Sequence, residues 1–156
     1  MAFRYVESVS ILYSQNTFDT SNPDVIAYLP SLLLPQRLHA IRSLRFYWSL
    51  TRAPTTAKDQ GERSFRYNDD VWQNIWRNLA SMRGLSDLVV GIHIPFIWQT
   101  QWTQREVAIL APVKAVTRPA CFEMILNFPS NAEEQLLDLP CHVIRVGQAR
   151  ASAAGS

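Results

Sequence analysis

Cysteine is scarce in this 156-residue sequence, which contains only Cys121 and Cys141. Small secreted proteins held together by disulfides carry more cysteines in a shorter chain. A disulfide scaffold is therefore disfavoured, and we expect two buried free thiols. No charged-then-apolar leader is recognisable at the N-terminus, and no apolar run approaches the roughly 20 residues needed to span a bilayer. We expect an intracellular protein, cytoplasmic or nuclear, with no membrane partner.

Lysine is almost as rare, because all but Lys58 and Lys114 of the 15 basic residues are arginine. Arginine favours planar ion pairs and stacking on aromatic rings. The arginines are scattered along the chain, and the formal net charge is only +2. Attraction to a phosphate backbone needs a basic patch or stripe, so we expect no nucleic-acid partner.

Motifs for catalysis and for cofactor binding are also missing. The five glycines stand alone at positions 61, 84, 91, 147 and 155, so no glycine-rich phosphate loop is present. His39, His93 and His142 have no partners at metal-ligand spacing. Cys141 beside His142 could contribute to a thiol site, but a buried thiol next to an outward-pointing imidazole is the simpler interpretation. The sequence predicts no catalytic residue, no metal and no cofactor, and it favours a non-enzymatic role.

Two segments of the chain follow one pattern. Ile41–Trp48 and Leu85–Ile92 both read apolar-x-x-Leu-x-apolar, and each follows a stretch of helical character. The clearest helix has its apolar residues on one face of a 3.6-residue period, at Trp72, Ile75, Trp76, Leu79 and Met82. Further strands are predicted to start near residues 120 and 141. Helix–strand units with right-handed crossovers predict a parallel sheet.

Several local signals can be checked against a structure. Residues 5–13 could form a helix or a buried strand. Asn22 is placed to cap a helix, and Gly84 to end one in the left-handed conformation. Thr103 and Glu106 have the spacing of a capping box at a helix start.

We therefore predict an α/β fold in which repeated helix–strand units form a short, degenerate leucine-rich-repeat-like arc. The alternative is an α/β sandwich with a mixed sheet. Residues 1–146 should form a single domain, with a polar loop at residues 51–66 and a short helix at residues 133–139. The tail at residues 147–156 is small and polar, and we expect it to be disordered.

A family resemblance runs through most of the chain. Residues 11–18, 32–38 and 41–48 together resemble a pattern, LYSxNTF followed by LLPQRLxxIRSLxLxW, found in a group of uncharacterised filamentous-fungal domains. A tryptophan-rich helix like residues 72–76 and a turn like residues 82–88 follow in that group. Members often stand behind an F-box-like segment, which implies that the domain holds a substrate for a ubiquitin-ligase adaptor. No such segment precedes Tyr5, so we expect a truncated relative or a diverged stand-alone domain.

Candidate binding residues come from strand alternation and from the tryptophan content. Arg45 and Tyr47 alternate with Leu44, Phe46 and Trp48 in the sequence, so both should point to one face of the sheet. His93 alternates with its isoleucine neighbours and should lie on the same open face.

Trp98 and Trp102 lie four residues apart among polar residues. They could form an exposed anchor for a partner or the wall of a pocket. Packing beneath a loop is the commoner fate of such residues.

These observations favour a non-catalytic protein-recognition domain that uses Arg45, Tyr47, His93, Trp98 and Trp102. The alternative is a small-molecule-binding protein, or a cofactor-free enzyme of a fungal natural-product pathway, with an aromatic pocket. A third interpretation is a self-associating domain that dimerises through an unpaired edge strand. The partner and the oligomeric state do not follow from the sequence.

Overall fold

The structure is a computed structural model that describes residues 2–50, 69–129 and 138–146. In chain order its elements are α1 (Ala2–Gln15), β1 (Thr17–Thr20), α2 (Pro23–Ala27), α3 (Leu29–Leu32), α4 (Pro35–Ala40), β2 (Ser43–Ser49), α5 (Asp69–Ser81), β3 (Asp87–His93), η2 (Phe96–Trp98), α6 (Gln99–Gln104), α7 (Glu106–Leu110), η3 (Ala111–Ala115), β4 (Cys121–Leu126) and β5 (His142–Arg145). The predicted loop at residues 51–66, most of the predicted helix at 133–139 and the tail at 147–156 lie outside the described residues.

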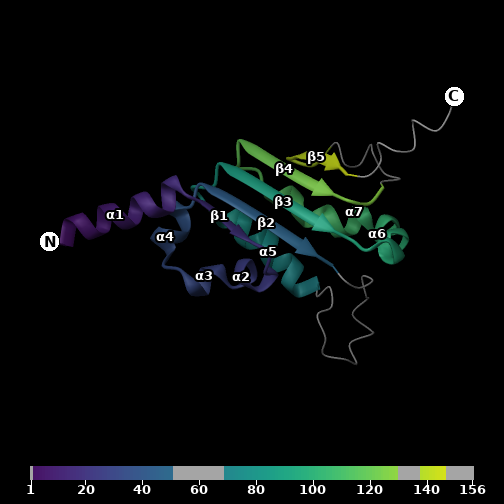
Figure 1. The fold of residues 1–156 in the computed structure, drawn as a ribbon, viewed down its shortest axis with the longest axis horizontal. Helices are drawn as coiled ribbons and strands as arrows, with labels where there is room; N and C mark the ends of the chain where they lie inside the picture. Colours follow the sequence, from purple (N-terminus) through teal and green to yellow (C-terminus); the bar gives the residue numbers. More distant parts are fainter. Residues whose placement is uncertain (1, 51–68, 130–137, 147–156) are drawn as a thin grey trace.

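The strands form one sheet whose spatial order equals the chain order, β1-β2-β3-β4-β5. Every strand pair in it is parallel. Helices α5 and α7 lie behind the sheet in the view of Figure 1, so one face of the central strands is covered and the other faces away from the helices. We call this second face the open face. The α/β class with a parallel sheet is confirmed, and the mixed sheet of the alternative is wrong.

The core between sheet and helices is built around tryptophan rings. Trp72 and Trp76 of α5 are fully buried and meet edge to face at 5.4 Å between ring centroids. Trp48 of β2 packs on Trp72, and Phe122 of β4 packs on Trp76. The Trp72 indole N–H donates to the carbonyl of Ile109 at 2.7 Å, which satisfies the polar edge of a buried ring. The helical period predicted this buried face correctly.

The similarity between the two repeated segments corresponds to the register of β2 and β3. Leu44 pairs with Leu88, the shared leucine of the pattern, and both side chains are buried. Ile41 and Leu85, the first apolar residue of each segment, are buried as well. Equivalent positions of the pattern therefore lie side by side in the sheet.

The helix-terminus predictions are partly confirmed. Asn22 caps α2, because its Oδ1 accepts the backbone N–H of Asp24 at 3.0 Å. Gly84 does not adopt the left-handed conformation that we predict for it. A β-carbon there would lie 2.1 Å from the carbonyl oxygen of His39, so glycine is needed for the close approach of the α4 terminus.

Residues 5–13 belong to helix α1 and not to a strand. Figure 1 shows that α1 extends away from the sheet. Within the described ranges, no helix has the length and apolar character needed to cross a membrane.

Candidate functional site

The open face is made by alternate residues of the five strands. In β2 the side chains of Leu44, Phe46 and Trp48 are buried in the core, and the residues between them are exposed. Arg45 and Tyr47 therefore share the open face, as the alternation predicts. His93, the last residue of β3, is exposed and pairs in register with Ser49 of β2. The structure brings these three candidate residues to one surface, while their role in binding stays a prediction.

The parallel register arranges this surface in rows across the strands. One row carries charge and runs, in sheet order, through Asp19, Arg45, Val89, Glu123 and His142. The charged residues and His142 are exposed, and Val89 is half-buried. We call these five residues the charged row. Sequence reasoning did not single out Asp19 or Glu123, although Glu123 alternates with Phe122 and Met124, which are buried in β4. His142 is exposed, in agreement with the outward-pointing imidazole inferred from the sequence.

The next row is apolar and consists of Tyr47, Gly91, Ile125 and Ile144. The ring of Tyr47 lies over Gly91, where an added β-carbon would be 2.5 Å from Tyr47 Cδ1. Tyr47 keeps 42% of its surface exposed, and both isoleucines are half-buried. The open face therefore carries a partly apolar row directly beside the charged row.

The structure separates the two tryptophans from this surface. Trp102 is 1% exposed and belongs to the core. Trp98 is half-buried and packs against that core. Of the two interpretations left open for Trp102, the exposed anchor is wrong and packing is confirmed, because α6 turns this ring inward. The exposed apolar residues of this segment are Phe96 and Ile97, at 87% and 69% exposure, and sequence reasoning did not single them out.

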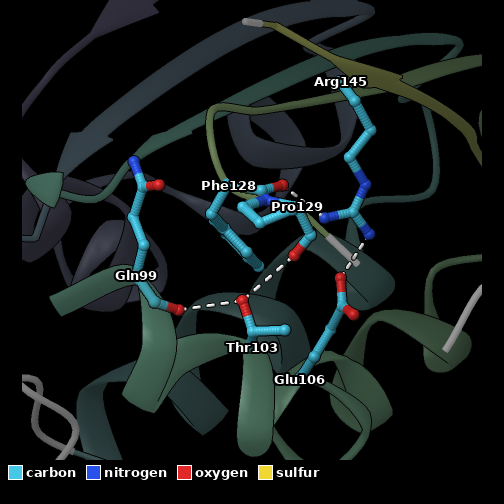
Figure 2. A network of polar contacts seen from close by, with 6 residues as sticks. All are labelled: Gln99, Thr103, Glu106, Phe128, Pro129 and Arg145. Carbon is cyan, nitrogen blue, oxygen red and sulfur yellow. Dashed lines mark hydrogen bonds and ion pairs between the residues drawn. The ribbon is translucent and has the colours of Figure 1, made fainter. Parts of the chain in front are cut away.

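A buried ion pair lies beneath the last two strands, on the helix side of the sheet. The Glu106 side chain in α7 is fully buried and accepts a hydrogen bond from Nη2 of Arg145 in β5. Nη1 of Arg145 donates to the carbonyl of Phe128 at 2.7 Å, and the guanidinium lies 5.3 Å from the centroid of the Phe128 ring. Figure 2 shows this arrangement. The guanidinium contacts Glu106, the carbonyl of Phe128 and the Phe128 ring, so the pair holds the short strand β5 against the helix layer.

The capping box predicted at residues 103–106 is wrong, because both side chains have other partners. Thr103 lies inside α6, and its hydroxyl donates to the carbonyl of Gln99 at 2.8 Å. The same hydroxyl lies 3.0 Å from the carbonyl of Pro129, as Figure 2 shows. Glu106 turns to Arg145 instead of capping the helix.

Asn127 joins the ends of β3 and β4. Its Oδ1 accepts the backbone N–H of Ile94 at 2.7 Å, and its Nδ2 donates to the carbonyl of the same residue at 2.8 Å. Gln99 Nε2 also reaches the carbonyls of Ile94 and Asn127, at 3.2 Å each. The side-chain amides of Asn127 and Gln99 thus continue the hydrogen bonding between β3 and β4 past the last residues of these strands. Ligands bind at this edge in many parallel sheets, and here Asn127 and Gln99 hydrogen-bond to the backbone at the ends of β3 and β4.

The two cysteines are free thiols and do not form a disulfide. Cys141 packs against the core, and burial raises the pKa of its thiol to about 11. Cys121 is exposed, which differs from the expected burial of both. His142 points to the open face, so the Cys141 thiol lacks the activation that a nucleophile needs. No group of three or more histidine, cysteine, aspartate or glutamate side chains gathers as a metal site within the described ranges.

Residues 3–147 match the family described as Domain of unknown function (DUF7730). The chain belongs to this family. The match spans the whole described DUF7730 sheet, from β1 to β5, together with the helices that cover it. No curated protein matches the chain significantly, and neither does any solved structure.

Proposed function

We propose that this DUF7730 domain is a non-catalytic protein-recognition module that binds a protein partner on its open face. The observation that carries the proposal is the row structure of that face. Five parallel strands present exposed charged residues in the charged row and half-buried apolar residues in the row beside it. An apolar centre with charged neighbours gives a partner both burial energy and orientation.

Several finer statements belong to this proposal. The sequential helix–strand units would form a short leucine-rich-repeat-like arc, a shape that commonly recognises partners on its strand side. The resemblance to F-box-associated fungal domains suggests that the bound protein is a substrate presented to a ubiquitin-ligase adaptor. Arg45, Tyr47 and His93 are the proposed contact residues.

Affinity purification with matched variants tests the proposal. The bait is the whole chain, compared with the same chain carrying Arg45→Ala or Tyr47→Ala. Arg77→Ala and Tyr28→Ala are the matched controls, because both residues are exposed and lie on α5 and at the end of α2, away from the open face.

We expect a protein partner that the controls retain and the open-face variants lose. Retention by all four variants would place the binding surface elsewhere and contradict the proposal. A bait that retains no protein but carries a metabolite would instead support the alternative of a small-molecule-binding protein.

A further inference from the structure

The charged row has a pattern that matters for the choice of partner. In sheet order it reads acid, base, apolar, acid, imidazole, from Asp19 through Arg45, Val89 and Glu123 to His142. Reversing this order about Val89 places Arg45 opposite Glu123 and Asp19 opposite His142. Each carboxylate then faces a basic or hydrogen-bond-donating side chain. The row is therefore complementary to its own reverse.

Among the residues that the structure describes, Glu106 and Arg145 form an ion pair that does not involve the charged row. Arg45 and Glu123 lie on β2 and β4, two strand spacings or about 10 Å apart, with Val89 between them. Asp19 and Arg45 are register neighbours, yet no ion pair joins these two described residues. Exposed charges of both signs, with no ion-pair partner in ranges 2–50, 69–129 and 138–146, are therefore available to a partner.

The apolar row beside it is compatible with the same reversal. Tyr47 on β2 would face Ile125 on β4, and Gly91 on the central strand would face its own copy. Gly91 lies beneath the Tyr47 ring, so the centre of the face carries no protruding side chain of its own. Apolar residues would therefore meet apolar residues next to the paired charges.

We propose that the partner of the open face is a second copy of this chain, docked face to face about a two-fold axis that runs parallel to β3. This inference rests on the proposed function, because it assigns a partner to the same face. Such an axis exchanges β2 with β4 and β1 with β5, and it keeps each row at its own height. Arg45 of each copy then meets Glu123 of the other, which is the self-complementary contact that a two-fold interface requires.

The charges also select between the two simple face-to-face arrangements. A two-fold axis perpendicular to the strands, level with the charged row, would keep each strand over its own copy. Arg45 would then face Arg45, and Glu123 would face Glu123, and like charges placed directly opposite each other are destabilising. The axis parallel to β3 gives the attractive arrangement, with the two sheets aligned as in β-sandwiches.

The area of the open face determines how tightly we expect the two copies to bind each other. Four strand spacings of about 4.8 Å give a width of about 19 Å, and seven residues of about 3.3 Å give a length of about 23 Å. An interface of this area falls at the small end of specific protein contacts. We expect a reversible dimer with a dissociation constant on the order of 10 µM, weakened by added salt.

Charge reversal on the whole chain tests the arrangement by sedimentation equilibrium at about 0.1 mM protein. Arg45→Glu and Glu123→Arg are each expected to be monomeric, because each leaves two pairs of like charges across the interface. An equimolar mixture of the two variants should restore the dimer as a one-to-one pair. The double variant Arg45→Glu/Glu123→Arg should restore a homodimer. Arg77→Glu, the same charge change on the exposed side of α5, should sediment like the unmodified chain.

The outcomes also separate this inference from the proposed function. An unmodified chain that is monomeric at this concentration overturns the dimer, and so do single variants that dimerise normally or mix without pairing. If the chain is monomeric and Arg45→Ala still abolishes capture of another protein, the recognition proposal stands with a different partner. If neither dimer nor capture is seen, both proposals fail. Thermal unfolding of each variant confirms that a monomer is folded.

Discussion

The ring of Tyr47 in β2 occupies the space that a β-carbon on Gly91 in β3 would fill, with Cδ1 2.5 Å from that position. The two residues are direct register partners on the open face. Glycine weakens a strand because it has no side chain to pack, and an aromatic neighbour that covers it offsets this loss. The Tyr47 ring is therefore positioned by the absence of a side chain on the neighbouring strand.

Gly91→Ala should destabilise the domain by about 1 kcal/mol, because the added methyl group forces the Tyr47 ring from its position. Urea unfolding of a double-mutant cycle measures the effect. In the Tyr47→Ala background the same change should cost nothing or stabilise, because alanine has less unfolded-state entropy to lose than glycine. An equal cost in both backgrounds would contradict the packing described.

Glu106→Leu or Arg145→Met should each destabilise by about 3–5 kcal/mol, because one partner of a buried ion pair is left uncompensated. The double variant Glu106→Leu/Arg145→Met should recover most of this loss. Chemical denaturation of the two single variants and the double variant gives the comparison. Additive losses in the double variant would show that the two side chains do not depend on each other.

Asn127→Ala should cost about 1–3 kcal/mol, since the backbone N–H and carbonyl of Ile94 each lose a partner. Hydrogen exchange at the Ile94 amide should accelerate beyond the change in overall stability. Asn74→Ala is a matched control, because Asn74 accepts a hydrogen bond from Arg77 within α5 and bridges no strands. Unchanged exchange at Ile94 would mean that Asn127 does not hold the end of β3.

The two thiols should react at very different rates. Cys121 is exposed, whereas burial raises the pKa of Cys141 to about 11. Because the thiolate is the reactive form, Cys141 at pH 8 is ionised in roughly one molecule in a thousand. Alkylation followed by peptide mass analysis should label Cys121 first, and labelling of Cys141 should rise as the pH approaches 11.

The raised pKa of the Cys141 thiol also makes the stability of the folded protein depend on pH. A thiol pKa that is higher in the folded than in the unfolded state favours folding of the neutral form, so stability is retained below pH 9 and falls as the pH rises toward 11. Cys141→Ser should flatten this part of the stability curve. Rapid labelling of Cys141 at neutral pH in the folded protein would contradict the burial.

Local periodicity predicted the parts of the fold that depend on neighbouring residues. The buried face of α5 follows from the spacing of Trp72, Ile75 and Trp76, and the open-face position of Arg45 follows from the alternation in β2. The shared pattern of two segments predicted helix–strand units, and in the structure the leucines of that pattern, Leu44 and Leu88, are register partners. In each case one short stretch of sequence carries the information.

Pairings between distant residues were not predictable in this way. Glu106 and Arg145 meet because the chain returns to β5 after passing through α7 and β4, and nothing local marks either residue as a partner. The polar neighbours of Trp102 left exposure and packing both open, and α6 buries this ring while Thr100 and Gln101 beside it are exposed. The charged row likewise could not be identified without knowing the register of all five strands.

The two outer strands have a consequence for how this protein behaves when concentrated. β1 and β5 have four residues each, against seven in β2 and β3. An outer strand this short offers little unpaired backbone for a neighbour to extend, and open-ended growth of fibres begins at such edges. The dimer proposed above would instead end at two molecules, because the open face of each copy would be covered by the other. At high protein concentration we therefore expect dimers and no visible aggregation.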